Sequence, residues 1–114
     1  MSEVMTVREN NDIRIVDVNG DLASYAAVHL RKKLELLVRQ RIYKLIVNLS
    51  NSESINSRSV SVLFGIAVQV RQQNGDLKIC GLTGILRRTF DLLGTSKVLE
   101  VYSSEADAIA SFYN

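Results

Sequence analysis

The sequence has no proline and no tryptophan, and its 114 residues include only one cysteine and one histidine. A single cysteine, Cys80, excludes an intrachain disulfide framework and a cage of cysteine ligands, and it suits a reducing compartment. One cysteine and one histidine, His29, in separate elements are too few to form a zinc centre. We therefore expect no metal site.

Long apolar runs and an excess of one charge are also missing. No apolar run approaches the 18 residues or so of a membrane span, and the first residues lack the basic and apolar regions of a signal peptide. Fourteen lysines and arginines against twelve acids leave a formal net charge of +2. That is too small to indicate nucleic acid or an anionic membrane as partner. We expect a cytoplasmic protein.

Side chains for catalysis are sparse. His29 lies on a predicted helix without a second strong general base, and the acids Glu53 and Asp91 are isolated. The residues 81–84 read G-x-x-G, which lacks the spacing of a dinucleotide fingerprint and the lysine of a phosphate loop, so we interpret them as a turn. The sequence predicts neither an enzyme activity nor a cofactor.

What is present is an ordinary globular composition, with 46% hydrophobic and 23% charged residues. The length fits one domain, residues 1–114. Hydrophobic patterning predicts strands at 4–7, 13–18, 43–49, 77–80 and 98–102. The run at 43–49 is continuously apolar, which predicts a central strand covered on both faces.

Helices are predicted between these strands, at 24–41, at 60–70 and its continuation to 73, at 85–93 and at 104–112. The segment 60–70 also alternates as a strand would. Its length and the Asn74-Gly75 stop favour a helix. The resulting order, ββαβαβαβα, predicts the α/β class, with helices packed against a mixed β-sheet.

The loop between the central strand and the helix at 60–70 is rich in small hydrogen-bonding side chains, so we place the helix start near Ser57 to Ser59. A serine hydroxyl there has two uses. It can cap the helix by accepting a hydrogen bond from a backbone N–H, or it can be phosphorylated, because the positive end of the helix dipole tolerates a phosphate. Both uses stay open at this point.

Two surfaces follow from the same pattern. The helix at 24–41 carries a basic face, which we interpret as solvated because no aromatic residues interleave with the basic ones. If exposed, Phe64, Tyr102 and Tyr113 would offer apolar contacts for a homodimer. The basic face consists of Arg31, Lys32, Lys33, Arg39 and Arg41.

Four stretches of the sequence resemble a known bacterial family, the anti-sigma factor antagonists built on the STAS domain. They are 18–22, 44–50, 55–60 and 86–90, the last followed by Leu93-Gly94. The resemblance covers nearly the whole chain and implies a STAS-like fold without catalytic apparatus. It also implies a partner, an anti-sigma factor with serine kinase activity, whose binding frees a sigma factor.

In that family the junction reads Asp-Ser-Ser/Thr-Gly-Leu, and the partner kinase phosphorylates the first serine. Matched residue by residue, that serine falls on Ser57. Asn56 stands where the family has Asp, Arg58 where it has a small hydroxyl residue, and Ser59 where it has Gly. Asn56 can still cap the helix but brings no charge, whereas Arg58 could pair with a phosphate or with a partner carboxylate.

The resemblance thus predicts a partner-switching regulator controlled by phosphorylation of Ser57. Two alternatives remain: a non-switching STAS scaffold subunit, which the loss of the Asp and Gly positions would suit, and a small nucleotide-binding protein that uses the same helix N-terminus. The residues predicted to bind the partner are Asn56, Ser57, Arg58, Ser59, Val60 and Phe64.

Overall fold

The structure is a computed structural model that describes residues 5–22 and 26–113. Its centre is a five-stranded sheet with the strand order β1-β2-β3-β4-β5. The first pair, β1 and β2, is antiparallel, and every later pair is parallel. The mixed sheet is the one expected. Its strands are β1 (Met5–Asn10), β2 (Ile13–Asn19), β3 (Lys44–Asn51), β4 (Asp76–Cys80) and β5 (Glu100–Tyr102).

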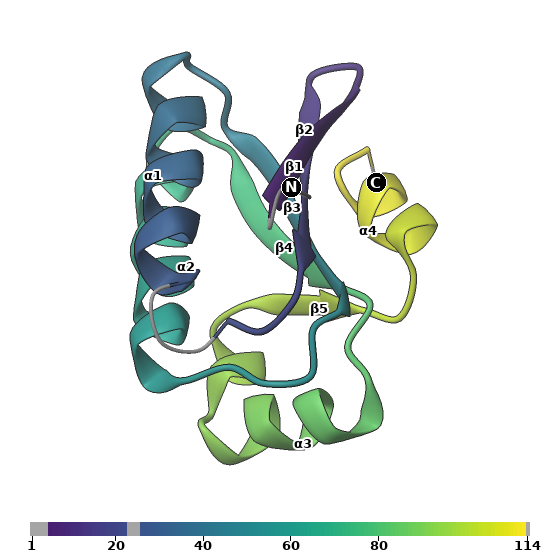
Figure 1. The fold of residues 1–114 in the computed structure, drawn as a ribbon. Coiled ribbons are helices and arrows are strands. Elements are labelled where there is room, and N and C mark those ends of the chain that lie inside the picture. Colours follow the sequence, from purple (N-terminus) through teal and green to yellow (C-terminus); the bar gives the residue numbers. More distant parts are fainter. Residues whose placement is uncertain (1–4, 23–25, 114) are drawn as a thin grey trace.

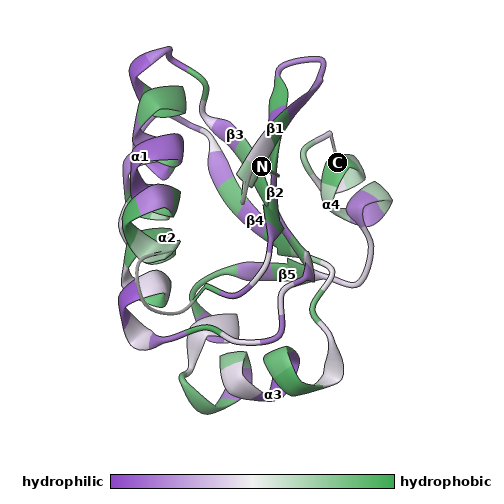
Figure 2. Ribbon diagram, viewed as in Figure 1, coloured by the Kyte–Doolittle hydropathy of each residue, from purple (hydrophilic) through white to green (hydrophobic). Residues whose placement is uncertain are grey.

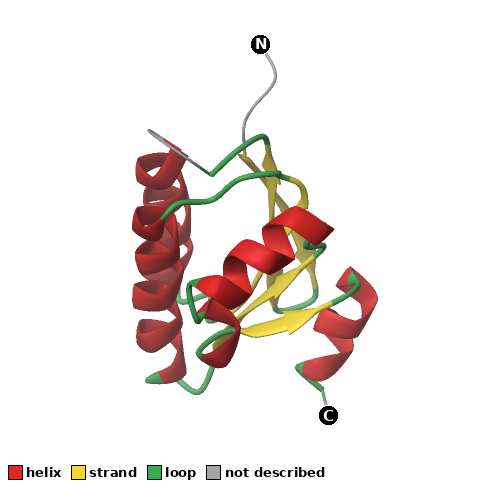
Figure 3. Cartoon of the chain, turned by 90° about the horizontal axis from the view of Figure 1, so that it is seen from below, coloured by secondary structure: helices red, strands yellow, loops and turns green. Residues whose placement is uncertain are grey.

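Helices cover both faces of the sheet and one of its ends (Figure 1). The helices α1 and α2 lie side by side on one face, α4 lies on the other, and α3 lies across the end where the parallel strands finish (Figure 3). This arrangement confirms the α/β class and the predicted order. The helices are α1 (Ala26–Arg39), α2 (Ser57–Arg71), α3 (Gly84–Leu92) and α4 (Glu105–Ser111), with a 3₁₀ turn, η1 (Thr95–Lys97).

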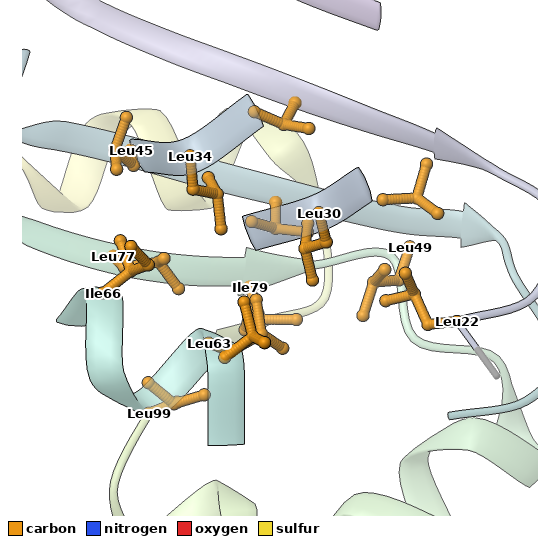
Figure 4. Close-up of a cluster of buried hydrophobic side chains, with 14 of the residues drawn as sticks. Leu22, Leu30, Leu34, Leu45, Leu49, Leu63, Ile66, Leu77, Ile79 and Leu99 are labelled. Carbon is orange, nitrogen blue, oxygen red and sulfur yellow. The ribbon is translucent and has the colours of Figure 1, made fainter. Parts of the chain in front are cut away.

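The main core lies between the sheet and the pair α1 and α2, where leucines and isoleucines from both layers point toward one another (Figure 4). A smaller cluster lies under α4. The alternation of β3 explains its apolar run, because Leu45 and Val47 face the main core while Ile46 faces the α4 cluster. The prediction of a central strand covered on both faces is confirmed.

The ambiguous segment after residue 56 is a helix. Its buried residues recur at helical spacing, since Val62, Leu63, Ile66, Ala67 and Val70 face the core. The same alternation of hydrophobic and hydrophilic residues along the helices can be followed in Figure 2. No helix among residues 5–22 and 26–113 combines the length and the apolar character needed to cross a bilayer.

Several predicted boundaries are wrong by a few residues. β1 runs on to Asn10, so the turn before β2 consists of residues 11 and 12. The last strand was expected from Val98 but begins at Glu100, because the backbone N–H groups of Val98 and Leu99 donate to the carbonyl of Thr95 at 3.1 and 3.0 Å and so complete the turn η1. The predicted start of the first helix at residue 24 lies outside the described residues.

Candidate functional site

The candidate site is the junction between β3 and α2, at the carboxyl end of the central strand. Ligand sites of open α/β sheets usually lie at this end. Asn56 is the N-cap of α2, with extended backbone, and its side-chain oxygen accepts a hydrogen bond from the backbone N–H of Ser59 at 3.0 Å. Ser57 is the first helical residue. The interpretation of this serine as the cap is therefore wrong, because the asparagine before it takes that role.

The capping by Asn56 leaves the Ser57 hydroxyl without a structural task. Ser57 is exposed, and no residue of the described ranges forms a side-chain hydrogen bond with it. The first turn of α2 contains no acidic side chain. A phosphate on Ser57 would thus meet the positive end of the helix dipole without displacing an existing bond.

Ser59 has a different environment. Its side chain is fully buried, and its hydroxyl donates a hydrogen bond to the carbonyl of Leu22. Leu22 also pairs with Ile55 in an isolated parallel bridge, and its N–H bonds to the carbonyl of Ser54 at 2.9 Å. Ser59 therefore cannot touch a partner in this structure; it fastens the first turn of α2 to the segment that follows β2.

The loops after β2 and β3 are joined by further hydrogen bonds that no sequence pattern indicated. Ser52 is fully buried, and its hydroxyl donates to the carbonyl of Gly20 at 2.6 Å. The backbone N–H of Glu53 donates to the Asp21 carboxylate at 3.2 Å. These bonds hold the loop that presents Ser57. The composition of the loop showed that it is polar. It could not show which of its residues bond to residues 32 positions earlier in the sequence.

The other predicted contact residues lie on or near the outer side of α2. Arg58 is exposed, Val60 is half-buried against the core, and Phe64 is 41% exposed. One turn beyond Phe64, Val68 is 39% exposed. The structure thus places a cation in the first turn of α2 and two exposed apolar side chains about two and three turns beyond Ser57 on the same helix. Val68 was not predicted as a contact residue.

Of the aromatic residues proposed for a homodimer contact, Tyr113 and Phe64 are exposed. Tyr102 is half-buried, and the Lys78 ammonium lies 5.5 Å from the centre of its ring. The Tyr102 hydroxyl also donates to Glu100 at 2.7 Å. Tyr102 is therefore occupied within the chain and is a poor candidate for a contact between copies.

The turn at 81–84 has a structural role at the same end of the sheet. Gly81 has a φ of +80°, and a Cβ there would lie 2.7 Å from Asn48 Oδ1 and 2.9 Å from the backbone nitrogen of Ser50. Only glycine fits this close approach to β3. Gly84 begins α3. Residues 81–83 form a loop between β4 and α3, so the interpretation of all four residues 81–84 as a turn is wrong at Gly84, which already belongs to the helix.

Potential catalytic and metal-binding groups do not converge. His29 is exposed on α1, as predicted. Burial raises the pKa of the Cys80 thiol to about 11, so the reactive thiolate is scarce at neutral pH. Within the part of the chain that the structure describes, no three histidine, cysteine or acidic side chains gather as metal ligands. The junction can offer a hydroxyl, cations and apolar contacts.

Comparisons with known proteins find related sequences. The model of the STAS domain family matches residues 4–108. An anti-sigma-B factor antagonist of Bacillus subtilis is 32% identical over 96 residues, covering 83% of this chain and 86% of that protein. An anti-sigma F factor antagonist of Paenibacillus polymyxa is 21% identical over 110 residues, covering 96% and 94%.

Solved structures show the same fold. A crystal structure of an anti-sigma factor antagonist from Mycobacterium paratuberculosis superimposes with a TM-score of 0.87 at 20% identity, covering 96% of this chain and 93% of that chain. The antagonist SpoIIAA in its unphosphorylated form gives a TM-score of 0.80 at 16% identity, covering 96% of each chain. At these identities the likeness concerns the fold alone.

Proposed function

The chain belongs to the STAS domain family and is a relative of its anti-sigma factor antagonists, and from this premise we propose that it is a partner-switching regulator controlled at Ser57. Its partner is an anti-sigma factor with serine kinase activity. Binding of the unphosphorylated chain occupies this partner and frees the sigma factor. Phosphorylation of Ser57 by the partner ends the complex.

The observation that carries this proposal is that Asn56, and not Ser57, caps α2, while Ser57 is exposed in the first turn. Asn56 caps α2, so modification of Ser57 removes no cap bond and leaves the fold intact. An N-cap hydroxyl contributes about 1 kcal/mol to stability, so phosphorylation of such a residue would lower the stability of the fold as well as change the surface. Here the phosphate changes the surface only.

The docking surface consists of the exposed or half-buried residues around Ser57. Arg58 and Asn56 supply polar contacts, whereas Val60 and Phe64 supply apolar ones. A stable interface needs roughly 800 Å² per partner, so the contact extends beyond these residues along α2. Ser59 contributes indirectly, because its bond to the Leu22 carbonyl fixes the first turn.

The phosphate acts through its charge at the centre of this surface. It adds about −1.5 to −2 charges at neutral pH. Against an acidic or apolar partner surface, repulsion and desolvation lower the affinity by a hundredfold or more, which corresponds to about 2.7 kcal/mol. At the same concentration, the unphosphorylated chain therefore binds a larger fraction of the partner than the phosphorylated chain does.

The test measures binding of purified candidate anti-sigma factors from the source organism to three forms of the chain. These are the unmodified protein, the protein with phosphoserine installed at position 57, and the control Ser103→Asp, which adds charge at an exposed residue before α4. We expect one candidate to bind the unmodified and control proteins equally and the phosphorylated protein at least a hundredfold more weakly.

Mapping the modification completes the test. Incubation of the binding candidate with ATP is expected to add one phosphate to the wild-type chain and none to Ser57→Ala. A candidate that binds all three forms with equal affinity would contradict the switch and would favour the non-switching scaffold subunit. That alternative draws on the Asn and Ser that replace the family's Asp and Gly at positions 56 and 59.

A further inference from the structure

Two arginines from different helices line one depression next to the candidate site. Arg31 of α1 and Arg58 of α2 border a hollow of about 120 Å³, together with Ala27, Val28 and Val62. The helices α1 and α2 run side by side (Figure 1), and this packing brings together Arg31 in the second turn of α1 and Arg58 in the first turn of α2. The two arginines are 27 residues apart, and nothing in the sequence indicated that they border the same hollow.

Neither arginine is used to hold the described part of the chain together. The ion pairs found among residues 5–22 and 26–113 involve other arginines and lysines. Glu35 lines a second hollow with Arg31 but forms no ion pair with it. Two like charges therefore border one small hollow without an ion-pair partner in the described part of the chain, an arrangement that favours an anionic group.

Ser57 is the neighbour of one of these two arginines in the first turn of α2. Ser61 borders the second hollow together with Arg31, and Ser57 precedes Ser61 by about one helical turn, roughly 5.4 Å along α2. Arg58 follows Ser57 directly. The Ser57 hydroxyl is exposed and free of side-chain hydrogen bonds to the described residues. Ser57 thus directly precedes, in the first turn of α2, the arginine that borders the hollow together with Arg31.

We propose that Arg31 and Arg58 bind the phosphate when Ser57 is phosphorylated, a form of regulation that rests on the proposed function. Guanidinium groups bind phosphate through paired, charge-assisted hydrogen bonds. The anion is therefore fixed against α1 instead of extending into solvent. Arg58 stands where the family resemblance implies a small hydroxyl residue, so this contact belongs to this chain's own residues.

The charge balance changes what the partner must recognise. Before modification the hollow carries two positive charges, and a phosphate of about −1.5 to −2 brings their sum close to zero. Phosphorylation thus turns a basic patch into a nearly neutral one, instead of turning a neutral patch into an acidic one. A partner surface that distinguishes the two forms is then acidic. Its carboxylates bind the arginines of the unmodified chain, and in the modified chain the phosphate binds these arginines instead.

The test needs neither kinase nor partner. Phosphoserine is incorporated at position 57 during translation, and its second pKa is measured by ³¹P NMR titration at about 0.15 M salt. The reference is a peptide of residues 55–60 with the same phosphoserine. Arginines within a few ångströms lower the pKa of an anion by about 1 to 3 units. We expect a value at least about one unit below that of the peptide.

Variants test whether the two arginines cause the lowered pKa. Arg31→Gln and Arg58→Gln should each raise the phosphoserine pKa part of the way toward that of the peptide. Arg31→Lys, which keeps the charge but lacks the paired N–H donors of the guanidinium, should raise it less. The control Arg39→Gln removes one charge from the same helix about 12 Å farther along its axis. That distance exceeds the screening length of about 8 Å, so the control should leave the pKa unchanged.

A wild-type phosphoserine that titrates like the peptide would overturn the proposal. So would an Arg39→Gln variant that raises the pKa as much as Arg31→Gln does, because the effect would then be one of net charge. The outcome is separable from that of the proposed function. A lowered pKa without any loss of partner affinity refutes the switch alone, and partner release without a lowered pKa refutes the arginine contact alone.

Discussion

The charged residues under α4 and the two arginines beside the candidate site, Arg31 and Arg58, are used in opposite ways. On the α4 face, charges are paired within the chain: Arg8 bonds to Asp17 on β2 and to Glu105 on α4. The buried ammonium of Lys78 donates to Ser111 of α4 at 2.7 Å and lies 4.4 Å from the Phe112 ring centre. On the α1 and α2 face, Arg31 and Arg58 form no ion pair with the described residues.

This difference separates stability from function. The α4 face buries a small apolar cluster, so charge pairs help to attach a helix of seven residues. The α1 and α2 face buries the main core, and there Arg71, the last residue of α2, pairs with Asp76 at 2.9 Å. Arg31 and Arg58, which form no ion pair with the described residues, are available to a phosphate or to a partner. Removal of side chains from each region should therefore change different measured quantities.

The largest loss of stability should follow Leu63→Ala. Leu63 is fully buried in the main core, and truncation of such a leucine costs about 2 to 5 kcal/mol because it leaves a cavity. The neighbouring residue is a matched control: Phe64→Ala should cost less than about 1 kcal/mol, since that ring is 41% exposed. Urea unfolding measures both free energies. Equal losses would show that the core does not dominate stability on this face.

A smaller and pH-dependent loss should follow Arg8→Gln. Hydrogen bonds from Arg8 hold the pKa of Asp17 below its ordinary value of 3.8. This pair therefore contributes stability above about pH 4 and loses it as the pH falls through the lowered folded-state pKa. An exposed pair contributes up to about 1 kcal/mol, so the melting temperature should fall by roughly 4 °C at neutral pH.

The pH series is what tests the Arg8 pair. The melting temperatures of wild type and Arg8→Gln, followed by circular dichroism, should converge as the pH approaches 2. Arg87→Gln serves as control, because its i,i+4 pair with Asp91 spans 3.9 Å on the surface of α3 and should contribute little at any pH. A difference between wild type and Arg8→Gln that stays constant with pH would exclude Asp17 as its source.

Patterns within short stretches predicted the fold. The alternation at 13–18 and the apolar run at 43–49 identified two neighbouring strands, and the strand-like alternation at 60–70 was correctly outweighed by length and the Asn74-Gly75 stop. The start of the last strand was missed, because Val98 and Leu99 continue the apolar pattern while their N–H groups bond to Thr95 in η1. Contacts between distant segments, such as the bond from Arg71 to the Val98 carbonyl 27 residues later, are contained in no local pattern.

The candidate site was only partly predictable for the same reason. Ser57 and its place at a helix start followed from the loop composition and the family resemblance. Asn56 and Ser57 both suit an N-cap position. Asn56 is the cap because its backbone is extended, whereas Ser57 is already helical, and the sequence does not reveal this difference. The burial of Ser59 depends on Leu22, and the nearness of Arg31 to Arg58 depends on how two helices pack.

The smallest effects on stability should come from Arg31→Gln and Arg58→Gln. These variants test the contrast between paired and available charges most directly. Glutamine keeps much of the methylene stem that covers Ala27 and Val62, so only the charge is removed. A charge without an intramolecular counter-charge contributes no attraction to the fold, and its removal relieves repulsion from the other arginine. We expect each variant to lie within about 0.5 kcal/mol of wild type in urea unfolding. A loss as large as that of Arg8→Gln would mean that these guanidinium groups do stabilise the folded chain, and the contrast between the paired charges under α4 and the available charges beside Ser57 would then be wrong.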